Sequence, residues 1–348
     1  MKDDNIKDKD TDSKTPGDTE EELTNSGAKR LEDLGGVGPK TAAKLRDFGY
    51  SLLGLATARA DEVAAQMKVS FNIAKGWVSE AQDIALAKMM LKTGTQVTKE
   101  RKAKQQFFKT GSNALNELMG GGFGTMRTTG ISGRFSTGKT QAAFGAIVDC
   151  LGRVKRKAVY VETEPDTYHE GRLKQIATAR KLDINLDDLY ICEASQIPTA
   201  KAQYLQYKVI QKALENGEDI GLIVVDSFTA KFRPGYSRRE MLPVRTREFS
   251  EHFTLIDYLA AKYNLGWVLT CQVIGAPDPG QSLGIKMKTG DSFYPVGGEY
   301  LLHSVNIWLG FQQIKTQLWK AILYDSSYLP RSDCEFMLTS KGLMDGIK

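Results

Sequence analysis

The stretch that decides the fold is Gly133-Arg134-Phe135-Ser136-Thr137-Gly138-Lys139-Thr140. Its spacing of Gly, four residues, Gly, Lys and Thr is that of a phosphate-binding loop. A strand-forming run, 126–131, precedes it, and an apolar helical pattern, 141–151, follows it. The alternative is a glycine-rich turn with a surface lysine, but the strand–loop–helix context favours a nucleotide loop.

Such a loop predicts a binding site for ATP with Mg²⁺. Backbone N–H groups of residues 135–140 would surround a β-phosphate at the positive end of the helix. Lys139 is expected to bridge the β- and γ-phosphates, and Thr140 to ligate Mg²⁺. The predicted nucleotide contacts in this stretch are Gly133, Arg134, Phe135, Ser136, Thr137, Gly138, Lys139, Thr140 and Gln141.

The composition indicates which class of protein this is and which partners suit it. The 348 residues are 41% hydrophobic and carry a formal net charge of +5. The first 22 residues are acidic, so the remainder is more basic, which permits a polyanionic partner. The four scattered cysteines suit a reducing compartment and favour neither a disulfide framework nor a zinc site. No apolar run is long enough to span a bilayer, so we expect a soluble cytoplasmic chain without a membrane partner.

Changes in pattern along the chain predict its domains. Residues 1–24 are polar and charged and are expected to be disordered. Residues 25–90 show short helical patterns, and 91–106 read as a polar, basic linker. From 107 to 348, apolar strand runs alternate with helical patterns. This alternation predicts an α/β domain with a mostly parallel sheet and helices on both faces.

The small helical region contains a glycine-rich hairpin. In residues 34–45, Gly36 and Gly38 permit a tight turn, and Pro39 opens the next helix. Such a helix–hairpin–helix turn offers N–H groups to a DNA phosphate, with Lys40 assisting. The alternative is a helix–turn–helix used for protein contacts. A second hairpin near 67–74 lacks the glycine pair and is expected to be structural.

Polar residues end three of the predicted strands of the larger domain. Asp226 follows the apolar run 222–225, where it can hold Mg²⁺ beside the phosphate loop. Glu164 follows 159–161 and is the candidate general base, with Glu162 as its competitor. For either carboxylate, the alternative is a solvated charge at the edge of the sheet. Gln272 follows 265–271 and is a candidate sensor of the γ-phosphate. A plain hydrogen-bonded amide is the alternative for Gln272.

Two long basic stretches leave the same edge of the sheet. Residues 233–247 are rich in arginine, and 275–298 are rich in Gly and Pro and carry Lys286 and Lys288. Long loops inside a compact domain are usually functional or disordered. Their charge favours a site that follows the backbone of single-stranded DNA, with a solvated charge run as the alternative.

These motifs, in this order, resemble the RadA-type recombinases of archaea, which are relatives of the RecA strand-exchange ATPases. The resemblance covers residues 28–348 and includes Gly120-Gly121-Gly122, 158–164, Val225-Asp226-Ser227, Gln272-Val273 and 295–298. It implies a RecA-like ATPase core that forms filaments on single-stranded DNA and pairs it with a homologous duplex. Lys139, Thr140 and Asp226 would then serve ATP and Mg²⁺, Glu164 catalysis, and Gln272 the switch.

The resemblance also implies roles for residues outside these motifs. First-loop DNA contacts would be Arg233, Arg239 and Arg245. Asp325 and Pro330 would lie in a cap over the neighbouring subunit's ATP. The family's polymerisation motif, Phe-x-x-Ala, is replaced here by 91–94, with Leu91 as the plug and Gly94 in place of Ala.

Several positions depart from the family pattern. Arg134 and Ser136 replace Glu and Gly in the phosphate loop, Pro165 replaces Gly after Glu164, and Cys271 stands where Asn is common. One alternative is therefore a RadA paralogue that regulates or assists a recombinase and works with other paralogues or mediators. Another is a kinase or helicase-like motor with a DNA-binding appendage. The hairpin domain and the missing second helicase lobe argue against the motor.

Overall fold

The computed structural model describes residues 30–88, 91–233, 236, 239–275 and 293–346. The chain divides into two compact units, residues 1–97 and 98–348. The boundary falls inside the segment 91–106 that the sequence predicts as a linker. The acidic tail, residues 1–24, lies outside the described residues, so its predicted disorder stays a prediction.

The first unit is helical. Its elements are the 3-10 turn η1 (Leu31–Asp33) and the helices α2 (Pro39–Asp47), α3 (Leu52–Ala56), α4 (Ala60–Met67) and α5 (Phe71–Lys88). Leu45, Leu55 and Val63 are completely buried between them, together with Ala74 of α5. In place of the first helix of the expected helix–hairpin–helix, the described residues contain only the three-residue turn η1.

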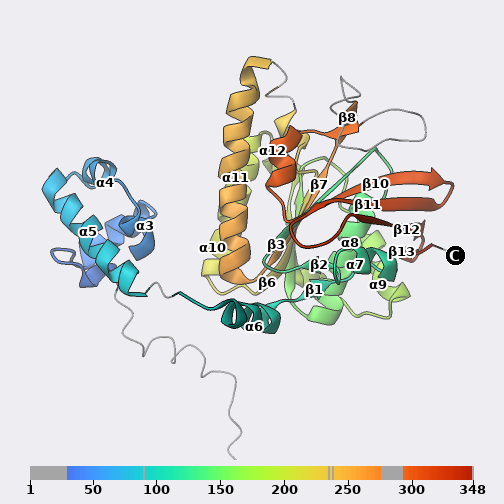
Figure 1. Ribbon diagram of the computed structural model, residues 1–348, viewed down its shortest axis with the longest axis horizontal. Coiled ribbons are helices and arrows are strands. Elements are labelled where there is room, and N and C mark those ends of the chain that lie inside the picture. Colours follow the sequence, from blue (N-terminus) through green and yellow to red (C-terminus); the bar gives the residue numbers. More distant parts are fainter. Residues whose placement is uncertain (1–29, 89–90, 234–235, 237–238, 276–292, 347–348) are drawn as a thin grey trace, which may run out of the picture. The chain divides into compact units, whose positions relative to one another are not determined.

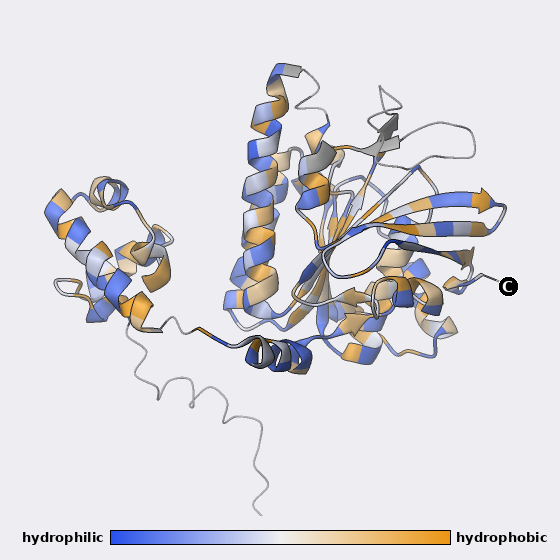
Figure 2. Cartoon of the chain, viewed as in Figure 1, coloured by the Kyte–Doolittle hydropathy of each residue, from blue (hydrophilic) through white to orange (hydrophobic). Residues whose placement is uncertain are grey.

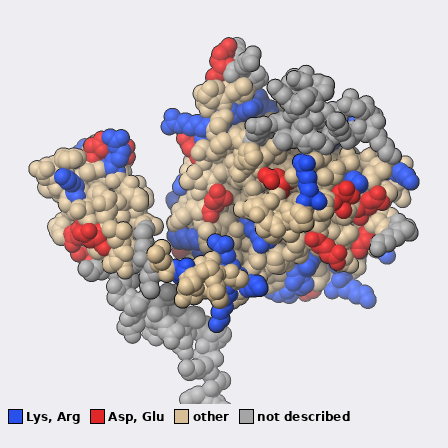
Figure 3. Space-filling model, in the orientation of Figure 1, with Lys and Arg blue, Asp and Glu red and all other residues tan. Residues whose placement is uncertain are grey.

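Helix α6 (Gly94–Lys104) occupies most of the predicted linker. All of its residues are exposed or half-exposed, and the helix is largely hydrophilic (Figure 2). Lys and Arg side chains gather along it (Figure 3). Because α6 buries no apolar stripe, it depends on local contacts, such as the hydrogen bond from the Gln96 N–H to Thr93 Oγ1 at 3.2 Å, and on its attachment at the C-terminal end. That attachment includes the bond from Asn264 Nδ2 to the Lys104 carbonyl, at 2.8 Å.

A nine-stranded sheet forms the centre of the second unit. Its spatial order is β13-β12-β11-β10-β3-β7-β6-β4-β5. The strands from β10 to β5 pair in parallel, whereas β10 to β13 form an antiparallel extension. The strand bounds are β3 (Arg127–Gly133), β4 (Lys157–Glu162), β5 (Leu189–Cys192), β6 (Ile220–Asp226), β7 (Gly266–Cys271), β10 (Ile307–Lys315), β11 (Leu318–Ser326), β12 (Ser332–Thr339) and β13 (Gly342–Asp345).

Short strands pair outside this sheet. β1 (Phe107–Phe108) pairs with β2 (Phe123–Gly124), and β8 (Val273–Gly275) pairs with β9 (Phe293–Pro295). The β8–β9 pair brackets residues 276–292, which contain Lys286 and Lys288. Both lysines lie outside the described residues.

Helices cover both faces of the central sheet (Figure 1). On one face, α7 (Asn113–Leu118), α8 (Lys139–Asp149) and α9 (Glu170–Ala179) share a core with Tyr160 and Val224. On the other, α10 (Ala200–Glu215) and α11 (Leu242–Tyr263) share a core with Val159 and Val225. Neighbouring residues of one strand thus enter opposite cores, which explains why these strands read as continuous apolar runs. The predicted α/β class and mostly parallel sheet are confirmed.

One element differs from its prediction. The stretch 233–247 was expected to be a flexible loop, but α11 begins at Leu242, after the 3-10 turn η7 (Arg239–Met241). Pro243 lies in the first turn of α11, where a missing N–H costs nothing, and the aromatic residues that follow bury one face. A last helix, α12 (Gly298–His303), follows β9. Within the described ranges, every helix is too short or too polar to cross a lipid bilayer.

Candidate nucleotide-binding site

The phosphate loop joins the end of β3 to the start of α8. Gly138 caps α8 with a φ of 91°, a conformation that favours glycine. A Cβ at Gly133 would lie 2.6 Å from the Phe311 carbonyl oxygen, so the close approach of β10 also requires glycine. Ser136 adopts a φ of 61° in the same loop. A non-glycine residue there is strained, which gives a structural meaning to the serine that departs from the family pattern.

A cavity of about 610 Å³ opens above this loop. It brings together, from four strand ends and one helix start, the side chains that the sequence singled out. The lining consists of residues 133–141, Glu164, Thr167, Asp226, Ser227, Gln272, Val273 and Leu338. The parallel strands β3, β4, β6 and β7 all end at this edge, where ligands of open α/β sheets bind.

Asp226 is held by three hydroxyl groups. It is only 5% exposed, and its Oδ2 accepts hydrogen bonds from Thr140 at 2.6 Å and from Tyr160 at 3.0 Å. Thr270 donates to Oδ1. A buried carboxylate is retained only when it has such partners. The Tyr160 and Thr270 contacts were missed by sequence reasoning. A lone threonine in the apolar run of β7 was the one available signal.

Lys139 points back into its own loop. Its Nζ donates to the carbonyl oxygens of Gly133 and Arg134, both at 2.9 Å. Burial lowers the pKa of Lys139, while the negative charge of Asp226 opposes that shift. A phosphate oxygen would exchange these neutral acceptors for a charged one, which is a stronger hydrogen bond.

The two candidate bases have different surroundings. Oε1 of Glu162 accepts hydrogen bonds from the backbone N–H groups of Thr167 at 2.8 Å and Tyr168 at 3.0 Å. This carboxylate therefore stabilises the turn that follows β4. Glu164 instead lines the cavity. Burial raises the pKa of Glu164, and the nearby charge of Asp226 adds to the effect. A raised pKa makes a carboxylate a better proton acceptor near neutral pH.

Gln272 contacts the second of these carboxylates. Its Nε2 donates to Glu164, and its Oε1 accepts from Arg233 Nη1 at 2.8 Å. Gln272 therefore lies between a cavity carboxylate and a cation from the first basic stretch. A residue that links the nucleotide site to the first basic stretch must touch both, and Gln272 does.

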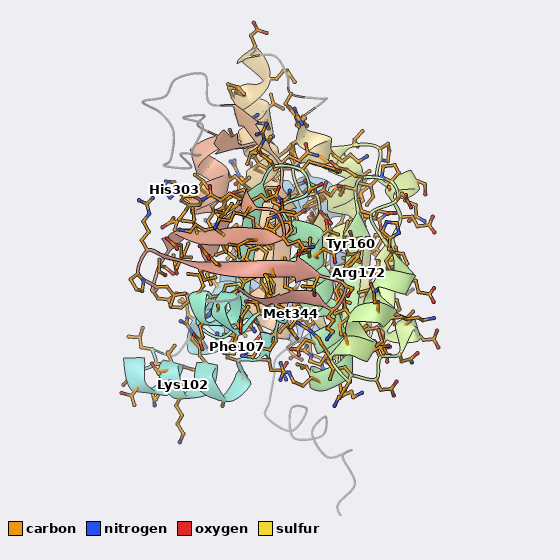
Figure 4. All side chains as sticks on the ribbon, turned by 90° about the vertical axis from the view of Figure 1, so that its right-hand side faces the viewer. Lys102, Phe107, Tyr160, Arg172, His303 and Met344 are labelled. Carbon is orange, nitrogen blue, oxygen red and sulfur yellow. The ribbon has the colours of Figure 1, made fainter. Side chains whose placement is uncertain are left out.

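Gln141 lies at the rim of the cavity and is held from the neighbouring helix. Arg172 of α9, labelled in Figure 4, donates from Nε to Gln141 Oε1 at 2.6 Å. Its other nitrogens bond the carbonyl oxygens of Thr339 and Ser340 in the β12–β13 turn. Arg172 thus joins α8, α9 and the antiparallel extension beside the cavity, and no sequence pattern predicted this role.

Comparisons with known proteins show the family of this chain. A family model described as Rad51 matches residues 101–346. The chain is also 31% identical over 323 residues to a protein named DNA repair and recombination protein RadA from Metallosphaera sedula, covering 91% of this chain and 96% of that protein. This chain belongs to the Rad51 family. The resemblance to RadA-type recombinases and the RecA-like core are thereby confirmed, and its family places it in DNA repair and recombination.

In this Rad51-family chain, the expected cap residues are not among those that line the cavity just described. Asp325 is exposed near the end of β11, and Pro330 is exposed in the connection to β12. The same connection is attached to the body by Tyr328, whose hydroxyl accepts from Arg127 Nη1 at 2.5 Å. The Arg127 guanidinium also lies 4.4 Å from the centre of the Tyr328 ring. The connection is therefore attached firmly while its outer residues remain accessible.

The expected first-loop arginines are in three different settings. Arg233 is exposed and bonded to Gln272. Arg239 is the first residue of the 3-10 turn η7. Arg245 was predicted to lie in a loop, but it lies in α11. Its guanidinium is 6.0 Å from the centre of the Phe249 ring. Burial lowers the pKa of Arg245.

The glycine turn of the first unit is held by α5. Gly36 has a φ of 76°, and Gly38 caps α2. The Gly35 N–H donates to Glu80 at 2.7 Å, and the Gly35 carbonyl accepts from Trp77 Nε1 at 3.1 Å. Lys40 lines a cavity of about 720 Å³ beside this turn, together with Lys44 and Glu80. An acidic side chain therefore already occupies one N–H of the turn that was predicted to meet phosphate.

The candidate polymerisation residues lie just before and at the start of α6. The Leu91 side chain is fully exposed, and Gly94 is the first residue of the helix. An exposed leucine next to a hydrophilic helix is available for contact with another molecule.

Proposed function

We propose that this chain is an ATP-dependent DNA recombinase that binds single-stranded DNA, assembles into filaments and promotes homologous strand exchange in repair. Membership of the Rad51 family supports the general role. The observation that carries the finer proposal is the convergence of Lys139, Thr140, Glu164 and Asp226 on one cavity at the carboxyl edge of a parallel sheet.

The residues present fit ATP and Mg²⁺. A hard cation prefers oxygen ligands, and the Thr140 hydroxyl and the Asp226 carboxylate lie side by side. When bound, the metal would supply charge neutralisation at the phosphates. Lys139 would hold the β- and γ-phosphates, and the loop N–H groups and the start of α8 would orient them. Glu164 would accept a proton from the attacking water.

DNA would meet the chain at two places. Arg233, Arg239 and Arg245 would contact the phosphates of single-stranded DNA, joined by Lys286 and Lys288 of the second basic stretch. Gly36, Gly38 and Lys40 of the first unit would hold a duplex backbone without reading its sequence. Both sets contact phosphates, which suits a protein that must accept any sequence.

Self-association would complete the nucleotide site. Asp325 and Pro330 are exposed and do not line their own subunit's cavity, as a cap for a neighbour's nucleotide would require. Leu91 would insert into the next subunit, with Gly94 loosening the linker where the family has Ala. Filament formation and ATP binding would then support one another, because ATP would lie between subunits.

Formation of D-loops from single-stranded DNA and a homologous supercoiled duplex tests this function. We expect joint molecules that require ATP, together with ATP hydrolysis stimulated by single-stranded DNA. The second candidate is a paralogue that assists a recombinase. The strained Ser136 in the phosphate loop and the aliphatic Leu91 favour it. ATP and DNA binding without D-loops, combined with stimulation of a partner recombinase, would establish the paralogue instead.

A further inference from the structure

Three side chains form a continuous row from the nucleotide cavity to the first basic stretch. Glu164 accepts from Gln272 Nε2, and Gln272 Oε1 accepts from Arg233 Nη1 at 2.8 Å. The polarity of the row is consistent, because the amide turns its donor to the carboxylate and its acceptor to the guanidinium. A single amide side chain therefore separates the proposed base from a proposed DNA contact.

The backbone around this row holds both ends in place. The Gln272 N–H donates to Thr229 Oγ1 at 3.2 Å, just before the 3-10 turn η5 (Ala230–Phe232). Phe232 is completely buried and stacks on Phe249 of α11 with ring centres 4.2 Å apart. Arg233 follows this anchor directly. Its backbone is thus fixed beside Gln272, while its side chain is exposed and can exchange partners.

The backbone carbonyl of Gln272 links the row to the second basic stretch. It accepts the Val296 N–H at 3.0 Å, immediately after β9. Val296 is buried, so this end of the second stretch is fixed as well. The backbone of Gln272 therefore contacts Thr229, just before the first basic stretch, and Val296 in the second. Its side chain contacts Glu164 and Arg233.

We propose that Arg233 is a positioning residue that restrains Glu164 through Gln272 and releases it when the guanidinium binds a DNA phosphate. A phosphate is a charged acceptor and forms a stronger bond with a guanidinium than an amide oxygen does. Once Arg233 has left, the Gln272 amide is free to rotate, and the Glu164 oxygen is freed to accept a proton from water. By linkage, the nucleotide state also affects how tightly Arg233 holds DNA.

This inference rests on the proposed function and assigns the first basic stretch a direct connection to hydrolysis. The sequence predicted a switch role for Gln272 but no contact between Gln272 and Arg233, which are 39 residues apart. Arg233 does not touch the reacting atoms in this arrangement. Its effect should therefore appear in how the rate depends on DNA.

The experiment measures ATP hydrolysis by the full chain with and without poly-dT, in wild type and in Arg233→Ala. We expect the variant to hydrolyse ATP several-fold faster than wild type without DNA, through kcat with an unchanged KM. The ratio of rates with and without poly-dT should fall toward one. Arg233→Lys keeps a cation and donor for Gln272 and should restore the low DNA-free rate, which general loosening of the structure would not explain.

Lys262→Ala is the control for the loss of one positive charge. Lys262 lies on α11 and bonds the Tyr258 hydroxyl at 2.8 Å, with no contact to Gln272. We expect wild-type rates from it. A DNA-free kcat in Arg233→Ala that equals or falls below the wild-type value would overturn the proposal.

Binding of a fluorescent ATP analogue provides a second readout if hydrolysis is too slow to follow. Wild type should bind the analogue with a different affinity when poly-dT is present, and Arg233→Ala should lose this difference. If the affinity difference persists unchanged in Arg233→Ala, the proposed role of Arg233 is wrong, whereas the proposed function still stands. A wild type that binds neither ATP nor DNA rejects the proposed function itself.

Discussion

Thr140 Oγ1 lies 2.6 Å from Asp226 Oδ2, although 86 residues separate them in the chain. This bond joins the phosphate loop to the end of β6. Because the hydroxyl and the carboxylate are both oxygen ligands, their contact places the proposed magnesium ligands together at one point of the cavity. Tyr160 and Thr270 hold the carboxylate in turn, so its orientation is set by strands β4 and β7.

Replacing Lys139 by alanine should abolish most ATP hydrolysis. The change removes the cation expected at the β- and γ-phosphates, and loss of such a charge contact typically slows the reaction roughly 10²–10³-fold. Phosphate release and ATP-dependent DNA binding check this. Lys174→Ala is the matched control, since Lys174 is an exposed α9 lysine paired with Glu170. Equal activity in Lys139→Ala and wild type would show that residues 133–140 are not the phosphate-binding loop for ATP.

Replacing Glu164 by glutamine should slow hydrolysis by roughly 10²–10⁴-fold while ATP still binds, because the amide keeps the shape but loses the basicity. The wild-type rate should fall as the pH drops through the pKa of Glu164, which burial raises above the ordinary glutamate range. A pH–rate profile with equilibrium nucleotide binding measures both effects.

Glu162→Gln is the comparison variant for Glu164→Gln. Its amide oxygen can still accept the N–H groups of Thr167 and Tyr168. We therefore expect near-normal hydrolysis. A loss of rate in Glu162→Gln with none in Glu164→Gln would show that the base was assigned to the wrong carboxylate.

Replacing Glu80 by glutamine should tighten binding of duplex DNA by roughly two- to fivefold, the range expected for one partly exposed charge. Glu80 accepts the Gly35 N–H beside the glycine turn, so its charge opposes a phosphate at the same place. Fluorescence anisotropy with a labelled duplex measures the effect, which should shrink as salt increases.

Glu62→Gln is the control for Glu80→Gln because it removes an exposed charge from α4 and leaves the turn untouched. Weaker duplex binding by Glu80→Gln would mean that the carboxylate organises the turn and does not compete with DNA.

Replacing Leu91 by alanine should break or shorten filaments. Leu91 is fully exposed, and truncation would remove roughly 1–2 kcal/mol from each contact between subunits. Leu91→Phe should lengthen the filaments because an aromatic ring buries more area, unless the receiving pocket has narrowed to fit leucine. Electron microscopy with ATP and single-stranded DNA compares the three proteins, with Leu86→Ala on α5 as an exposed-leucine control. Normal filaments from Leu91→Ala would exclude Leu91 as the plug.

Acid should destabilise the second unit through His252. This side chain is buried among Tyr204, Tyr207, Phe228 and Phe232, and burial lowers its pKa from 6.5 to about 4. Between these two pKa values, the unfolded chain binds a proton at His252, whereas the folded chain does not. The stabilising contribution is therefore complete above pH 6.5, falls as the pH drops toward 4 and is lost below that. The total is about 3 kcal/mol.

Thermal melting across this pH range compares wild type with His252→Phe. The variant keeps a ring in the aromatic cluster but cannot take up a proton, so its stability should depend less on pH. Identical pH dependence in the two proteins would show that His252 is not the group responsible.

The sequence by itself determined the features that depend on residues close together in the chain. The spacing of Gly138, Lys139 and Thr140 identified the loop, because only that order provides a turn, a cation and a hydroxyl at the start of a helix. Asp226 and Gln272 were found because each is polar and ends an apolar run. The α/β class followed from alternation, since a strand buried on both faces must be apolar throughout.

Only the tertiary structure decided which distant groups meet. Nothing in the sequence distinguishes Tyr160 from other core aromatic residues, yet strand register places its hydroxyl against Asp226. Arg245 was misplaced because a charged stretch reads as a loop, whereas burial of Phe249 and its neighbours turns it into helix. Glu162 and Glu164 have the same chemistry and differ in partners alone. The row from Glu164 to Arg233 exists because three chain segments pack at one sheet edge, and such through-space contacts leave no periodic trace in the sequence.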